Sequence, residues 1–133
     1  MMIGEVSART GLSVRTIRHY DHTGVVVPFD RSVGGFRLYS DADVRRLELV
    51  KTLRPLDLSL DHVRELLESM DQVVRGDGSA EERDPALAKL VEVRALAGRR
   101  VELMRGEIAG LERLVRDLQA IERGADVRSP GRH

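Results

Sequence analysis

The side chains with the clearest chemical potential are guanidinium, hydroxyl and imidazole groups at residues 13–22, which read SVRTIRHYDH. Guanidinium and hydroxyl groups bond to phosphates and to base edges, so this set suits nucleic-acid recognition better than catalysis. A recognition helix reads bases near its N-terminal end and grips phosphates with flanking side chains. The residues expected at base edges are Ser13, Arg15 and Thr16, and those expected at phosphates are Arg18 and Tyr20.

A second polar set follows in residues 29–39, around the SVGG sequence at 32–35. Two glycines between short runs of alternating apolar and polar residues predict a β-hairpin. A lone hairpin is only marginally stable in water, so it must pack against the helices or a ligand. On such a hairpin Arg31, Arg37 and Tyr39 would lie beside the nucleic-acid backbone or minor groove.

All of the aromatic side chains fall in one segment of the chain; they are Tyr20, Phe29, Phe36 and Tyr39. A chain with so few aromatic residues that gathers them in one place is expected to use them there, as wedges or as hydroxyl donors. For Phe29 and Phe36 the alternative is a small hydrophobic cluster, because large apolar residues are usually buried.

Catalytic chemistry is not indicated by the sequence. It holds no Ser, His and Asp constellation, no phosphate-binding loop and no metal motif, and its acids are spread as helix caps and solvated faces. His19 and His22 are three positions apart and in principle share a metal, but no third ligand is fixed nearby. We therefore expect a protein that is not an enzyme and needs no cofactor or metal.

Charge and composition limit how the chain would bind nucleic acid. Its 133 residues include 22 basic and 22 acidic side chains, so binding must depend on local charge. Residues 1–39 carry five arginines against three acids, although a single arginine is more often a solvated surface residue. The sequence has no cysteine, no signal peptide and no membrane-length apolar run, and we expect a cytoplasmic protein.

Helix signals place the first polar set on a helix-turn-helix. Residues 3–10 are predicted to form a short helix closed by Gly11, which suits the left-handed conformation that ends a helix. Ser13 is a good N-cap for a second helix over 14–22, and Gly24 follows its end. Two short helices joined by a tight turn are the helix-turn-helix signature.

Two further helices are predicted before residue 75. Ser40 and Asp43 have the form of a capping box that opens the first helix, and Pro55 stops it. Ser59 caps the second, whose apolar positions recur at helical spacing. Its expected inner-face residues are Leu60, Val63, Leu66, Leu67 and Met70. Residues 1–75 are thus expected to form a mainly α, winged helix-turn-helix DNA-binding domain with a small β-hairpin wing.

A long helix is predicted over residues 85–123, after a polar linker at 76–84 and before a disordered tail at 124–133. Pro85 would stand at the first helical turn, where its missing N–H costs nothing. Apolar residues then recur in alternating steps of three and four, which is the heptad pattern of a coiled coil. The seam comprises Leu87, Leu90, Arg94, Ala97, Val101, Met104, Ile108, Leu111, Val115 and Leu118, and only Arg94 is polar.

The seam needs a partner, because each large apolar side chain left in water costs roughly 1.5–3 kcal/mol. Too little chain remains to cover it, so we expect a second copy and a coiled-coil dimerisation helix. The alternative is that the helix folds back on its own N-terminal domain. The residues expected at the dimer interface are Leu90, Ala97, Val101, Met104, Ile108, Leu111, Val115 and Leu118.

The combined motifs resemble the N-terminal domain of MerR-family regulators. The matching residues are IGEV at 3–6, TGLSVRTIRHYD at 10–21, Gly24 and GFRLYS at 35–40, and the match continues through Leu53 to Leu67. The likeness covers the first half of the chain in detail and the rest in layout only. Three positions depart from the family pattern: His19 replaces a Tyr, Asp21 replaces a Glu, and LRPLDL at 53–58 replaces a Leu-Gly turn.

The resemblance implies a homodimer with an antiparallel coiled coil, the second helix of each subunit in a major groove and the wing on the adjacent backbone. Family members commonly distort promoters whose −10 and −35 elements are too far apart, until RNA polymerase engages both. By position, the resemblance implies groove contacts from Arg15 and Thr16, and phosphate contacts from Arg18, Tyr20, Arg37 and Tyr39. Metal- and redox-sensing relatives use cysteine thiolates, and the absence of cysteine from this sequence excludes that mechanism. A small-molecule effector, if one exists, is unknown.

Two other functions are compatible with the residues alone. An architectural protein would bend many DNA sites with little sequence preference, and a coiled-coil interaction protein would show no salt-dependent affinity for DNA. The spacing of the combined motifs favours a transcription regulator that acts on a promoter.

Overall fold

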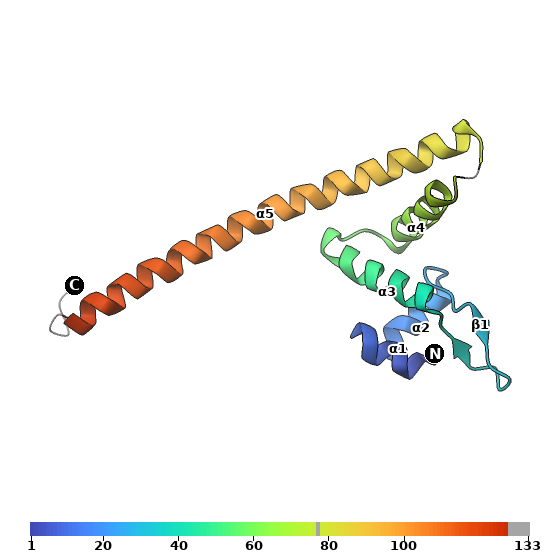
Figure 1. Ribbon diagram of the computed structural model, residues 1–133, viewed down its shortest axis with the longest axis horizontal. Helices are drawn as coiled ribbons and strands as arrows, with labels where there is room; N and C mark the ends of the chain where they lie inside the picture. The colour runs from blue at the N-terminus through green and yellow to red at the C-terminus, as the bar shows by residue number, and fades with distance from the viewer. Residues whose placement is uncertain (77, 128–133) are drawn as a thin grey trace. The chain divides into compact units, whose positions relative to one another are not determined.

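The computed structural model describes residues 1–76 and 78–127, and the chain divides into two compact units, Met1–Ala95 and Leu96–His133. The mainly α architecture with one small hairpin, predicted from the sequence, is confirmed (Figure 1). In chain order the elements are α1 (Ile3–Thr10), α2 (Val14–His22), β1 (Asp30–Arg31), β2 (Arg37–Leu38), α3 (Asp41–Leu53), the 3-10 turn η1 (Arg54–Leu56), α4 (Leu60–Arg75) and α5 (Ala80–Val127).

Local signals build the helix-turn-helix as predicted. Gly11 adopts a φ of 75° and donates its N–H to the carbonyl of Ser7 (2.9 Å), which ends α1. Leu12 then points into the core and is only 3% exposed. The Ser13 hydroxyl accepts the N–H of Thr16 and caps α2.

Two cations from later helices hold the ends of α1 and α2. Lys51 Nζ of α3 donates to the carbonyl oxygen of Thr10 at 2.7 Å. Arg64 Nη1 of α4 donates to the carbonyl oxygen of Thr23 at 3.1 Å. Both cations lie where the helix dipole is negative, and so α3 and α4 help to fix the two helices that precede them.

The core of the N-terminal unit collects the inner faces of α1 to α4 and residues that flank the hairpin. Val6, Ile17 and Leu47 are fully buried within it. The inner face expected for α4 is confirmed, with Leu60 and Met70 at its partly exposed margin. The buried cluster comprises Val6, Leu12, Ile17, Tyr20, Val25, Val26, Tyr39, Leu47, Val50, Leu53, Val63, Leu66, Leu67 and Val93.

The hairpin is short and is held from both sides. β1 and β2 pair antiparallel over two residues each, with Arg31 opposite Arg37. The N-terminal segment adds a bridge, because Met1 N donates to the carbonyl oxygen of Tyr39 and the N–H of Tyr39 returns a bond to Met1, both at 2.7 Å. The Asp43 carboxylate accepts the N–H of Phe29 at 3.0 Å. These contacts supply the support that a lone hairpin lacks.

The caps predicted for α3 and α4 are confirmed. Ser40 and Asp43 form a reciprocal capping box at the start of α3. That helix ends at Leu53, next to the turn that contains Pro55. Asp57 then adopts the left-handed conformation with a φ of 53°, which Asp tolerates better than most residues. The Ser59 hydroxyl caps α4.

The start of α5 differs from the prediction. The helix begins at Ala80, so the linker is shorter than 76–84 and Pro85 lies inside the helix rather than at its first turn. The carbonyl of Ser79 accepts the N–H of Arg83 at 2.9 Å, which completes a helical turn before the proline. Inside a helix proline loses the bond to the carbonyl four positions earlier and its ring crowds that carbonyl, but the turns on either side of Pro85 are helical.

The end of α5 also lies beyond the prediction, because the helix continues to Val127 rather than 123. The disordered tail expected at 124–133 is therefore wrong for 124–127, and the remaining residues lie outside the described part of the chain. Gly124 does not stop the helix, since one glycine costs only about 1 kcal/mol there. No helix within residues 1–76 and 78–127 is long and apolar enough to cross a membrane.

The first turns of α5 belong to the N-terminal unit and pack against it. Ala86 is 4% exposed and Val93 is 9% exposed, and Leu90 packs partly buried against the same core. Lys89 Nζ also lies 3.3 Å from a carboxylate oxygen of Glu65 on α4. Leu90, expected at a dimer seam, thus has an intramolecular partner. The apolar spacing of a helix is the same for both kinds of packing, so the sequence did not separate them.

Candidate nucleic-acid interface

The second helix presents one exposed polar face. Its buried residues are Ile17 and Tyr20, which anchor α2 in the core. The exposed residues recur at helical spacing, and they are Arg15, Arg18, His19 and His22. This arrangement turns two guanidinium groups and two imidazoles toward solvent along a single helix.

Ser13 and Thr16 lie at the start of this helix and bond to each other. The Ser13 hydroxyl accepts the Thr16 N–H at 3.0 Å and donates to Thr16 Oγ1 at 2.9 Å. Ser13 is exposed and Thr16 is half-buried, so both stay at the surface near Arg15. The Ser13 hydroxyl therefore caps α2, and the Thr16 hydroxyl accepts its hydrogen bond.

Tyr20 does not lie on the exposed face of α2, where a phosphate contact was expected. Its side chain is 6% exposed and fills the core. Its hydroxyl accepts a hydrogen bond from Arg54 Nη2 at 3.4 Å, which links α2 to the turn after α3. The ring belongs to the inner face because Tyr20 follows Ile17 by three positions, one helical turn.

Tyr39 is more deeply buried and also departs from its expected surface position. It is 1% exposed, and its hydroxyl has no hydrogen-bond partner among the residues that the structure describes. Burial raises the pKa of the Tyr39 hydroxyl, and the negative charge of Asp21 raises it further. A neutral hydroxyl enclosed in this way does not reach a phosphate, so a direct contact from Tyr39 is not supported by this placement.

Arg37 joins the hairpin to α2 through an ion pair with Asp21. Arg37 Nε donates to an Asp21 carboxylate oxygen, and the side chain of Asp21 is only 8% exposed. The hydrogen bond and the charge of Asp21 raise the pKa of Arg37. The sequence prediction included Arg37 but missed Asp21. An acid in the last turn of a helix opposes the helix dipole, and that signal indicates a cationic partner.

The hairpin also exposes apolar side chains. Phe29 is 64% exposed, Phe36 is 62% exposed and Val33 at the turn is fully exposed. The ring of Phe36 lies close to Gly34, within 3.1 Å of where a side chain there would begin. The packing alternative for Phe29 and Phe36 is therefore wrong, and the wing carries apolar groups beside the cations of Arg31 and Arg37.

Several known proteins are similar to this chain in sequence and in fold. The model of the MerR HTH family regulatory protein matches residues 1–70. The HTH-type transcriptional activator TipA of Streptomyces coelicolor is 35% identical over 129 residues, which are 97% of this chain but 42% of TipA, so the chain spans less than half of that relative. The HTH-type transcriptional regulator HmrR of Rhizobium leguminosarum bv. viciae is 39% identical over 93 residues, which are 70% of each protein.

A solved structure shows the same fold over nearly the whole chain. HiNmlR, described as a MerR family regulator lacking the sensor domain and bound to promoter DNA, matches with a TM-score of 0.63 at 23% identity. The match covers 95% of this chain and 92% of HiNmlR. Because the family model spans more than half of the chain and HmrR shares 70% of its length, this chain belongs to the MerR family of helix-turn-helix transcriptional regulators.

Proposed function

We propose that this chain binds promoter DNA as a homodimer and regulates transcription by distorting the spacer between the −10 and −35 elements. The observation that carries the proposal is the exposed face of α2, where Arg15 and Arg18 face solvent while Ile17 anchors the helix. The hairpin beside it adds Arg31 and Arg37. A rigidly held helix with cations at one face is suited to a DNA groove.

Within this interface the residues have different roles. Arg15 and Thr16 would read base edges in the major groove, with Ser13 at the helix N-terminus beside them. Arg18 and Arg37 would contact phosphates, which fix the register of the protein on the duplex. Tyr20 and Tyr39, both in the core, would support α2 and the hairpin from beneath.

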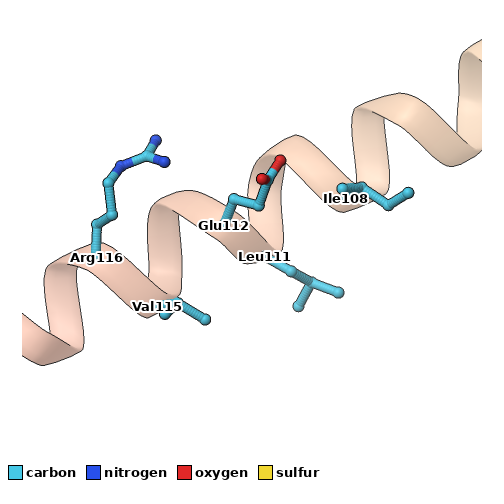
Figure 2. Close-up of a pocket in the computed structure, with 5 residues that line it drawn as sticks. All are labelled: Ile108, Leu111, Glu112, Val115 and Arg116. Carbon is cyan, nitrogen blue, oxygen red and sulfur yellow. The ribbon is translucent and has the colours of Figure 1, made fainter.

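Dimerisation would use the apolar face of α5 in the unit that begins at Leu96. Figure 2 shows Ile108, Leu111 and Val115 on one side of the helix and Glu112 and Arg116 on the other. Ile108, Leu111 and Val115 thus form an exposed apolar strip along one side of α5. Large seam residues in this unit are 43–62% exposed, and burying each would contribute roughly 1.5–3 kcal/mol. The proposed interface comprises Ala97, Val101, Met104, Ile108, Leu111, Val115 and Leu118.

Spacer distortion follows from a dimer that holds two recognition helices at a fixed separation. Bending a short DNA site costs of order 1–6 kcal/mol, which several charge-assisted phosphate contacts can offset. HiNmlR was solved with promoter DNA bound, and that supports promoter DNA as the partner of this chain too. RNA polymerase would then engage both promoter elements on the distorted duplex.

Transcription from promoters that differ only in spacer length tests this proposal. After footprinting locates an operator upstream of the gene, purified chain should change transcription by RNA polymerase from the natural long spacer. The same operator with a shortened spacer is the matched control and should respond differently. Binding to many unrelated sites with equal affinity would indicate an architectural protein instead. A folded chain with no salt-dependent DNA affinity would overturn the proposal.

A further inference from the structure

The Asp21–Arg37 pair lies next to a second arginine of the hairpin. The strand register places Arg31 directly opposite Arg37, so both side chains lie on the same face of the two-stranded ladder. Like charges in directly opposite positions destabilise a pair of strands. Asp21, from α2, is the carboxylate that bonds to this face, and its bond goes to Arg37.

The bond uses only one of the donor groups of the Arg37 guanidinium. Within residues 1–76 and 78–127, the hydrogen bond that Arg37 donates from its side chain comes from Nε. The two terminal nitrogens remain available, and the side chain is 35% exposed. Terminal guanidinium nitrogens bind phosphate oxygens in a fixed fork geometry, which is strongest when the fork is held in place.

We propose that Asp21 is a positioning residue for DNA binding: it holds Arg37 by Nε so that the terminal nitrogens face a backbone phosphate. The side chain of Asp21 is nearly buried, so the carboxylate is shielded from the phosphate that Arg37 would reach. This inference rests on the proposed function, because it assigns a role within the same interface.

For D21N, this role of Asp21 predicts a change of DNA affinity opposite in sign to the change expected from charge alone. D21N removes a negative charge near DNA, which alone would strengthen binding. If Asp21 positions Arg37, D21N instead weakens binding to promoter DNA by about tenfold, the worth of one charge-assisted hydrogen bond. The slope of log affinity against log salt should also flatten by about one unit, because one phosphate contact is lost. D21E keeps the carboxylate and should restore most of the affinity.

The matched control is D30N, which removes the same charge from the hairpin. Asp30 is exposed, and among the described residues its carboxylate accepts only the adjacent N–H of Arg31, so D30N should bind DNA as tightly as the parent or more tightly. R37K tests whether the planar guanidinium group is needed. A lysine ammonium group can pair with Asp21 or with the phosphate, but it lacks the planar set of donors that bonds to both at once. We expect R37K to lose about as much affinity as R37A.

The experiment measures affinity of the full chain for operator DNA across a salt series, with circular dichroism and thermal unfolding of each variant. D21N should cost no further affinity on the R37A background. Parent-like or tighter binding by D21N would overturn the positioning role. So would a double variant D21N/R37A in which D21N lowers the affinity as much as it does in the parent. If D21N does not fold, parent-like binding by R37K would overturn it instead. A folded parent that fails to bind any promoter DNA would overturn the proposed function itself.

Discussion

Arg64 Nη1 donates a hydrogen bond to the carbonyl oxygen of Thr23 at 3.1 Å, across 41 positions of the chain. Thr23 is the C-cap of α2, so the contact places a cation at the negative end of that helix's dipole. This contact ties α4 to the C-terminal end of α2.

We predict that Arg64→Ala lowers the free energy of unfolding by about 1 kcal/mol, through loss of a charge-assisted hydrogen bond and of the dipole interaction. Urea unfolding of purified protein measures the change. Arg45→Ala is the matched control, since Arg45 is an exposed arginine of α3, and its effect should stay within about 0.5 kcal/mol. Equal effects of the two variants would contradict a specific role for Arg64.

Asp43 should matter more to stability than its small size suggests. Its carboxylate accepts the N–H groups of Ser40 and Phe29, both at 3.0 Å, and the residue is 8% exposed. Asp43→Ala leaves both donors without that acceptor, and we expect a loss of about 2–3 kcal/mol. Asp41→Ala, at the exposed start of the same helix, should cost much less. Chemical unfolding of both variants compares them, and similar losses would argue against the capping contacts.

The helix ends of the N-terminal unit could be predicted from the sequence, because capping residues bond to groups only a few positions away. Gly11, Ser13, Ser40 and Ser59 each bond within their own helix end, so residue type and spacing were sufficient to predict them. Asp57 in its left-handed turn belongs to the same class. Local chemistry thus predicted the order of the helices and the place of the hairpin.

Contacts between segments that are distant in the sequence could not be predicted in this way. The pairing of Asp21 with Arg37 depends on how the hairpin folds against α2, and neither residue alone predicts it. Tyr20 and Tyr39 were expected to contact phosphate, with part of His19 or Tyr20 on the inner face of the second helix, whereas both tyrosine rings are buried in the core. Leu90 fits an intermolecular seam and an intramolecular one equally well by spacing, and only the packing of α5 on α4 separated them.

The buried hydroxyl of Tyr39 leads to an unusual expectation for Tyr39→Phe. That hydroxyl has no hydrogen-bond partner among the described residues, so removing it relieves an unpaired buried polar group. We expect the free energy of unfolding to stay equal or to rise by up to about 1 kcal/mol. Affinity for operator DNA should remain at the parental value. A clear loss of affinity with unchanged stability would show that Tyr39 contacts phosphate after all.

Arg15 and Arg37 should separate base reading from phosphate binding. Arg15→Ala is expected to weaken binding at the cognate operator by about 1–3 kcal/mol and to relax its sequence preference. Arg37→Ala should weaken binding to all sequences alike and reduce the salt slope by about one unit. Fluorescence anisotropy with operator and scrambled DNA over a salt series distinguishes the two patterns. Parental binding by both variants would show that α2 and the hairpin are not the DNA interface.

The dimer seam is testable by placing one charge on either side of α5. Leu111→Glu puts a carboxylate in the proposed apolar interface, where two copies would bury it, and an unpaired buried charge costs several kcal/mol. We expect the dimer dissociation constant to rise by at least about a hundredfold, measured by analytical ultracentrifugation. Arg116→Glu places the same side chain on the other side of the helix (Figure 2) and should leave the dimer intact. A stable Leu111→Glu dimer, or a parent that sediments as a monomer at micromolar concentration, would contradict the proposed seam. Loss of the dimer should also reduce operator affinity, because a single recognition helix then binds only one half-site. The fold of the Leu111→Glu variant should stay unchanged.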